Sequence, residues 1–72
     1  MDVKIVWEYR VESIGGTFSG PKDEELERVL DEWGEEGWEI ISADVPYGSS
    51  KVRLIAKRPL TLESRRRRSR PN

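Results

Sequence analysis

The stretch Trp33–Glu39 (WGEEGWE) constrains the fold of this chain more than any other. It closes a region with helical periodicity, in which apolar residues stand at i, i+3, i+4 and i+7: Leu26, Val29, Leu30 and Trp33. Gly37 occupies the place of a left-handed C′ residue, and Trp38 would be the C″ residue of a Schellman motif. The stretch therefore predicts a helix that ends at Glu35 or Glu36 and passes directly into a strand.

The first turn of this helix is less sharply defined. Pro21 suits a first helical turn, where its missing N–H costs nothing, and Ser19 or Gly20 could cap it. Asp23 is a competing cap. Near the other end, we expect Gly34 on the inner face, where the missing side chain would allow close approach to a sheet.

Residues 3–12 alternate with a period of two, which predicts a strand. We expect the odd-numbered apolar residues on the face under the helix: Val3, Ile5, Trp7, Tyr9 and Val11. The charged residues and Val6 would face the other way. Residues 38–45 and 51–58 read as two further strands, and the short connection between them indicates a hairpin.

The predicted order is β-α-β-β, an α+β fold with one helix on one face of a three-stranded sheet. A right-handed crossover makes the first two strands parallel. The strand order 1-3-2, mainly antiparallel, is preferred because the helix then covers a three-stranded sheet; the alternative is 1-2-3. Residues 1–62 are expected to form a complete single domain, and residues 63–72 a basic tail.

The composition of the 72 residues excludes several kinds of chemistry. The chain has no cysteine and no histidine. This removes disulfides, Cys/His zinc sites, Cys or His nucleophile–base pairs and haem ligation by these residues. No apolar run reaches the length of a membrane span and no signal-peptide pattern is present, so we expect a cytoplasmic protein. No cofactor, metal or small-molecule substrate is expected, and the chain is predicted not to be an enzyme.

A domain this small commonly gains stability from oligomerisation. With one helix covering one face, the other face would keep the predicted association residues Val6, Ile41, Ala43, Val45 and Ile55. We therefore predict a homo-oligomer, with a dimer favoured. The aromatic side chains are expected in the core: Trp7, Tyr9, Trp33 and Trp38. A stacking surface for nucleic-acid bases would require them on the open face instead.

Charge is divided unevenly along the chain. Residues 1–63 carry 8 Lys/Arg against 14 Asp/Glu, a net charge of −6, whereas residues 64–72 carry five arginines and no acid. Nucleic-acid phosphates are candidate partners for these arginines: Arg65, Arg66, Arg67, Arg68 and Arg70. The alternatives are a tail that adds solubility or one that binds an acidic helix surface. A nucleic-acid accessory protein is thus the alternative function.

Two other stretches have some features of a functional site. The Gly15–Gly20 loop follows a strand and precedes a helix, as a phosphate cradle does, but Pro21 replaces the lysine and acidic residues follow. Glu35, Glu36 and Glu39 gather near the helix end, but acid–base chemistry needs a cleft that a single helix on a sheet hardly offers. Glu39 is expected to form an ion pair with a basic side chain across the sheet or to contact a second chain.

Three segments together resemble a known family: WEYRV at residues 7–11, GEEGWEIIS at 34–42 and LIAKRPL at 54–60. In order and spacing they resemble a family of uncharacterised bacterial and phage proteins, the domain of unknown function four-one-seven-seven. The resemblance covers residues 3–60 and excludes the tail and the Gly15–Gly20 loop. It supports the fold but implies no activity. The sequence therefore favours a non-catalytic, self-associating interaction module.

Overall fold

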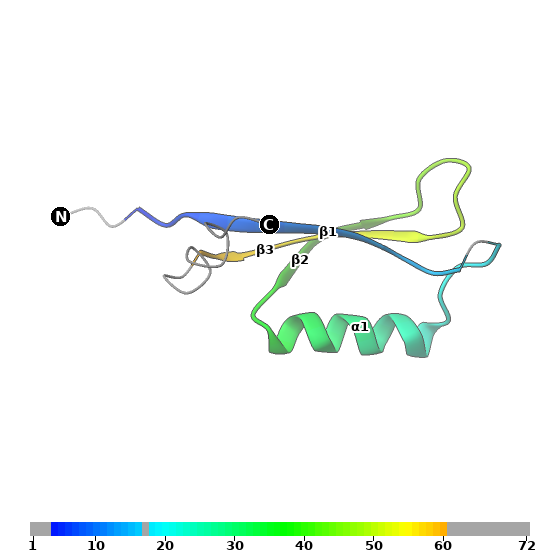
Figure 1. Cartoon of the computed structure of the whole chain (residues 1–72), viewed down its shortest axis with the longest axis horizontal. Coiled ribbons are helices and arrows are strands. Elements are labelled where there is room, and N and C mark those ends of the chain that lie inside the picture. Colours follow the sequence, from blue (N-terminus) through cyan, green and yellow to red (C-terminus); the bar gives the residue numbers. More distant parts are fainter. Residues whose placement is uncertain (1–3, 17, 61–72) are drawn as a thin grey trace, which may run out of the picture.

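The computed structural model describes residues 4–16 and 18–60, which form one helix and a three-stranded sheet. The elements are β1 (Trp7–Ile14), α1 (Asp23–Glu35), β2 (Glu39–Asp44) and β3 (Val52–Pro59). β3 lies between β1 and β2 and is antiparallel to both. The predicted α+β fold and the preferred order 1-3-2 are confirmed, and the order 1-2-3 is wrong. Figure 1 shows α1 on one side of the sheet only.

Helix α1 begins at Asp23, so the prediction that Pro21 lies in its first turn is wrong. Lys22 is the N-cap and makes no side-chain capping bond, while its carbonyl accepts a hydrogen bond from the N–H of Leu26. Acidic residues occupy the first turn, where their negative charges interact favourably with the positive end of the helix dipole: Asp23, Glu24 and Glu25. The start of the helix is therefore stabilised by these charges and not by a side-chain cap.

The predicted Schellman motif is present at the end of α1. Gly37 has a φ of +90°, and its N–H donates to the carbonyl of Gly34 at 3.0 Å. The N–H of Trp38 donates to the carbonyl of Trp33 at 2.9 Å. These two bonds satisfy carbonyls that the helix end would otherwise leave unpaired.

Gly34, by contrast, does not fulfil its predicted role. It is exposed, and a Cβ added to it would meet no atom within 4 Å outside its own helix turn. The prediction of a close approach between Gly34 and the sheet is therefore wrong. Gly34 is a helical residue for which alanine has room.

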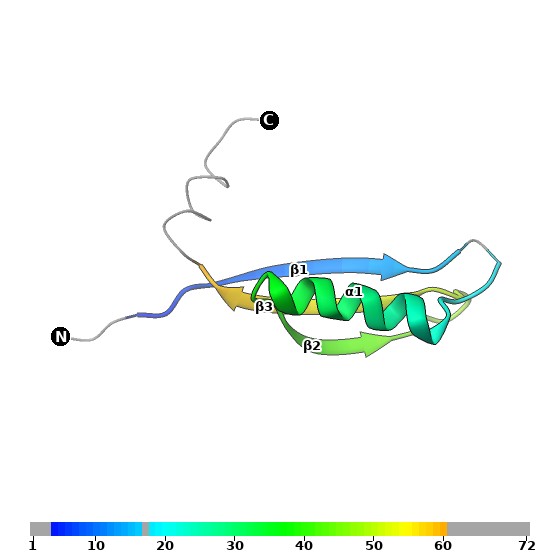
Figure 2. The same ribbon diagram turned by 90° about the horizontal axis from the view of Figure 1, so that it is seen from below.

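The core lies between α1 and the central strand. Figure 2 shows α1 running along β3, between β1 and β2. Four buried residues form its centre: Val29, Trp33, Leu54 and Ala56. Six partly buried residues pack against them: Ile14, Leu26, Leu30, Trp38, Ile40 and Val52. From β1, only Ile14 belongs to this group.

Candidate association surface

The pairing register assigns each side chain of the sheet to a face. On β3, the buried Leu54 and Ala56 face α1, and their partners on β1 are Glu12 and Arg10. Because residues directly opposite each other share a face, the even-numbered residues of β1 lie on the helix side. The odd-numbered residues of β1 therefore lie on the open face, which is the reverse of the prediction.

The reversal moves the apolar side chains of β1 out of the core. Trp7 is half-buried, and Tyr9 and Val11 are 62% and 61% exposed. On the open face, Val11 lies opposite Ile55, and Tyr9 opposite Lys57. The predicted core positions of Trp7 and Tyr9 are wrong, while Trp33 and Trp38 do lie with the core. Ile5, also predicted beneath the helix, is 61% exposed, and Val3 lies outside the described residues.

Arg10 is the reason why a charged strand face can lie beside the helix. Its guanidinium carbon is 4.1 Å from the centre of the Trp33 ring and 5.9 Å from that of Trp38. Its nitrogens reach carboxylate oxygens of Glu36 at 3.4 Å and Glu12 at 3.2 Å. A long side chain can cover an indole with its apolar stem and planar head while its charge stays paired. Arg10 thus takes the place that an aliphatic side chain was expected to fill.

A second polar group lies at the start of β1. Arg58 donates to Oε1 of Glu8 at 3.2 Å, and their side chains are only 19% and 11% exposed. The same guanidinium donates to the carbonyl of Glu36 at 2.6 Å and lies 4.2 Å from the ring centre of Trp38. The other Glu8 oxygen, Oε2, is buried without a hydrogen-bond partner among the described residues. A buried carboxylate oxygen of this kind favours an additional donor.

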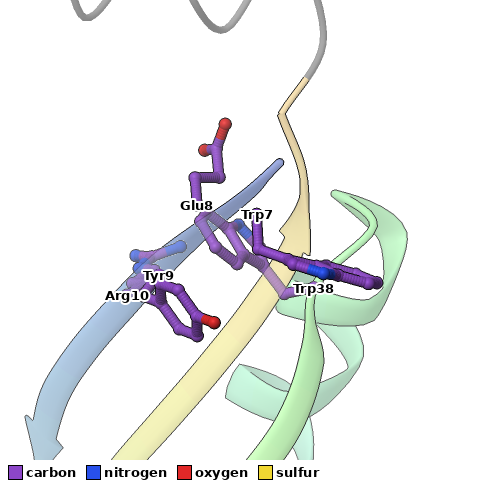
Figure 3. Close-up of a pocket in the computed structure, with 5 residues that line it drawn as sticks. All are labelled: Trp7, Glu8, Tyr9, Arg10 and Trp38. Atoms are coloured by element: carbon purple, nitrogen blue, oxygen red, sulfur yellow. The ribbon is translucent and has the colours of Figure 1, made fainter. Parts of the chain in front are cut away.

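An open concavity of about 470 Å³ lies beside this group. Figure 3 shows the side chains that line it, four consecutive residues of β1 and one that precedes β2: Trp7, Glu8, Tyr9, Arg10 and Trp38. Residues from both faces of β1 contribute to the lining. The lining combines aromatic rings, one acid and one base.

The outer edge of β1 carries backbone groups that pair with no other strand among the described residues. The N–H of Leu60 donates to the carbonyl of Val6 at 2.7 Å, which extends the β1–β3 register. In antiparallel pairs, alternate residues turn their N–H and C=O toward the partner, so Glu8, Arg10 and Glu12 bond to β3. The backbone groups of Trp7 and its odd-numbered successors consequently point away from the sheet.

The edge formed by β2 differs. β2 has six residues against eight in β1, and its register shifts between Ile40 and Ser42. On the open face it presents acidic side chains: Glu39 opposite Lys57, and Asp44 bonded to Arg53 at 3.1 Å. A bulge, short length and charge all discourage pairing with another strand.

The bulge also changes the predicted association residues. Ile55 lies on the open face, and Ile41, 47% exposed, lies in the bulge beside Ser42. Ala43 lies opposite Leu54 and therefore on the helix side. Val6 also falls on the helix side through its pairing with Leu60. Val45, 55% exposed, follows β2. The predicted surface is therefore corrected: we define the β1 face as Trp7, Tyr9, Val11 and Ile55.

At the remaining predicted sites, the structure shows few contacts that would support a binding or catalytic role. The ammonium of Lys57, the residue opposite Glu39, lies 4.4 Å from the ring centre of Trp7. Near the Gly15–Gly20 loop, Ser50 donates to the carbonyl of Gly16 at 3.4 Å. Residues 4–16 and 18–60 hold no cluster of three acidic or other ligating residues that could bind a metal ion. The tail arginines lie outside the described residues.

Comparisons of the chain with models of protein families, with curated proteins and with solved structures found no match. The resemblance to the domain of unknown function four-one-seven-seven therefore stays a prediction. Helix α1, the only helix in the described part of the chain, is too short and too polar to cross a membrane.

Proposed function

We propose that this chain is a non-catalytic interaction module that associates with further copies of itself through the β1 face and the edge beside it. One observation carries the proposal: Trp7, Tyr9 and Val11 lie on the side of the sheet that α1 does not cover. Exposed apolar side chains gathered on one face are a common mark of an association surface.

The size of the core supports the same proposal. Among the described residues, four are buried hydrophobics, and none of them comes from β1. Contact between copies would bury aromatic and aliphatic area that the single chain leaves in water. Each 100 Å² of apolar surface removed from water contributes roughly 2.5 kcal/mol before the costs of association. Association would thus supply stability that one helix on one sheet does not.

The experiment is a mass measurement by sedimentation equilibrium at micromolar concentration, in low and high salt. The proposal predicts a mass of two or more chains of 8.4 kDa each. An interface of this apolar kind should persist in high salt, since screening weakens exposed charge pairs and leaves apolar burial intact. A mass of one chain at both salt concentrations would contradict it.

The exposed aromatics also favour one alternative, a nucleic-acid accessory protein of the cytoplasm. Base stacking on a sheet requires aromatic side chains on the open face, and Tyr9 is there with Lys57 opposite it. The arginines of residues 65–70 would add phosphate contacts. Binding should then weaken steeply with salt, with a log–log slope of about −4 to −5 for five contacts. A low-salt gel shift that shows no retention would exclude this alternative.

Two variants separate the contribution of the tail to nucleic-acid binding from that of the sheet. Deleting residues 64–72 should abolish the gel shift if the arginines bind phosphate, and Tyr9→Ala should weaken it only if bases stack on the sheet. Neither change touches the four buried core residues. Retention of the full-length shift by the deletion variant would exclude the tail as the anchor.

A further inference from the structure

Building on the proposed self-association, we infer that two copies pair antiparallel along the outer edges of β1, with Tyr9 opposite Tyr9 of the second copy. Three observations lead to this: the outward-pointing backbone groups of the edge, its charge pattern, and the apolar residues beside them. Together they specify both the occupant and the register.

The backbone limits the choice of register. The outward-pointing groups belong to odd-numbered residues, so a second β1 can bond only where odd residues oppose odd residues. Three registers keep most of the strand paired. They centre on Tyr9 opposite Tyr9, on Arg10 opposite Arg10, or on Val11 opposite Val11.

Charge excludes the middle register. With Arg10 opposite Arg10, Glu8 would also oppose Glu12, so every charged pair on the helix side would be of like sign. Like charges directly opposite in a sheet are destabilising. The other two registers place an acid opposite a base, because acids and bases alternate along this face of β1.

The charges do not distinguish the remaining two. In the Tyr9 register, Glu8 opposes Arg10 of the second copy at a closely spaced pair. In the Val11 register, Arg10 opposes Glu12 of the second copy. Each acid already has a partner within its own chain, since Glu8 accepts from Arg58 and Glu12 accepts from Arg10.

The apolar residues of the open face distinguish the two registers. In the Tyr9 register, Trp7 opposes Val11 of the second copy and the two Tyr9 rings are neighbours, so all these apolar side chains gain cross-strand contacts. The Val11 register would place Tyr9 opposite Ser13. Trp7–Ile14 contains no proline, no bulge and no lysine, so three of the usual barriers to edge pairing are missing from this strand.

Substitutions at Val11 test the edge pairing. Val11→Pro removes an N–H that points away from its own sheet, and proline is tolerated at such edge positions. Val11→Thr keeps the shape and the N–H but loses the apolar methyl. We expect Val11→Pro to raise the dissociation constant of the dimer about a hundredfold, since two symmetric bonds are lost. Val11→Thr should raise it about tenfold or less, and both should keep the circular dichroism of the folded chain.

The register is tested by distance. The chain has no cysteine, so Ser13→Cys carries a single spin label, and pulsed dipolar spectroscopy measures its separation between copies. In the Tyr9 register, the labelled residues of the two copies are offset by eight residues along the paired strands, which is about 27 Å at 3.4 Å per residue. The Val11 register predicts about 14 Å, and the Arg10 register about 20 Å.

The results separate the two proposals. A dimer with labels near 27 Å, lost in Val11→Pro and kept in Val11→Thr, supports the edge pairing. A dimer at another distance, or one that Val11→Pro and Val11→Thr weaken equally, overturns the edge pairing and leaves self-association standing. A single-chain mass for the unmodified protein overturns both.

Discussion

The two edges of this sheet are built in opposite ways. β1 is eight residues long, keeps an unbroken register with β3 and places Trp7, Tyr9 and Val11 beside the backbone groups that point out of the sheet. β2 is shorter, contains a register shift and carries Glu39 and Asp44 on the same face. The difference supports the proposal that copies pair through the β1 edge, because the features that discourage pairing gather at the β2 edge.

The largest effect is expected from a charge placed at each edge in turn. Val11 and Ser42 flank Ile55 on either side of β3, so they are matched positions on the open face. Val11→Lys should reduce the mass to one chain, because a desolvated ammonium opposes pairing. Ser42→Lys should leave the mass unchanged. Sedimentation equilibrium of both variants checks this, and equal losses would show that the edges do not differ.

A smaller effect, on stability, is expected at the helix end that directs the chain into β2. Gly37→Val should lower the free energy of unfolding by about 1 kcal/mol or more, because valine disfavours a φ of +90°. Urea titration of the variant and the parent measures the change. A variant that unfolds at the parent's midpoint would show that the Schellman motif does not require glycine.

A change of the opposite sign in the free energy of unfolding is expected at Gly34, three residues before Gly37. Gly34→Ala should raise the free energy of unfolding by about 0.5–1 kcal/mol, since Gly34 is helical and an added Cβ meets no atom outside its own turn. The association mass should stay the same, because α1 lies on the far side of the sheet from the β1 face. Lower stability by urea titration would indicate a contact that the described residues lack.

The smallest effect is expected at the β2 edge. Asp44→Asn removes an exposed ion pair with Arg53, at 3.1 Å. Exposed pairs of this kind contribute roughly 0–1 kcal/mol, so the urea midpoint should fall slightly if at all. If this single change also produced larger assemblies, it would show that charge alone protects the β2 edge.

Much of the fold could be predicted because its signals are local. The apolar stripe that ends at Trp33 and the glycine at position 37 specify the end of the helix and the start of β2. Alternation in β3 identifies Leu54 and Ala56 as one face, and both are buried. The strand order followed from the need to place one helix over three strands.

The face of β1 could not be predicted from the same pattern. Alternation separates two sets of residues, but which set lies under the helix depends on register with β3. Counting apolar residues selected the wrong set, because Arg10 covers Trp33 as an aliphatic residue would. One signal was present: Val6 and Ile14, at the two ends of the charged set, are apolar.

The β2 bulge could not be predicted from the sequence either. Nothing in residues 39–44 marks an extra residue, so the simple alternation placed Ala43 with Ile41, whereas the register shift places Ala43 with Leu54. Two of the five residues predicted for the association surface, Val6 and Ala43, therefore lie on the helix side, while Ile55 lies on the open face. Self-association itself stays a proposal, and the proposed surface is now centred on β1.

The most direct test of the β1 edge is amide hydrogen exchange at Tyr9 and Val11, measured by NMR at several protein concentrations. Both N–H groups point out of the sheet of one chain, as does that of Ala43 on β2 by the same alternation. Pairing through β1 predicts that Tyr9 and Val11 exchange slowly and lose protection on dilution, while Ala43 exchanges fast throughout. Fast exchange at Tyr9 and Val11 in a sample whose mass is that of a dimer would contradict the account.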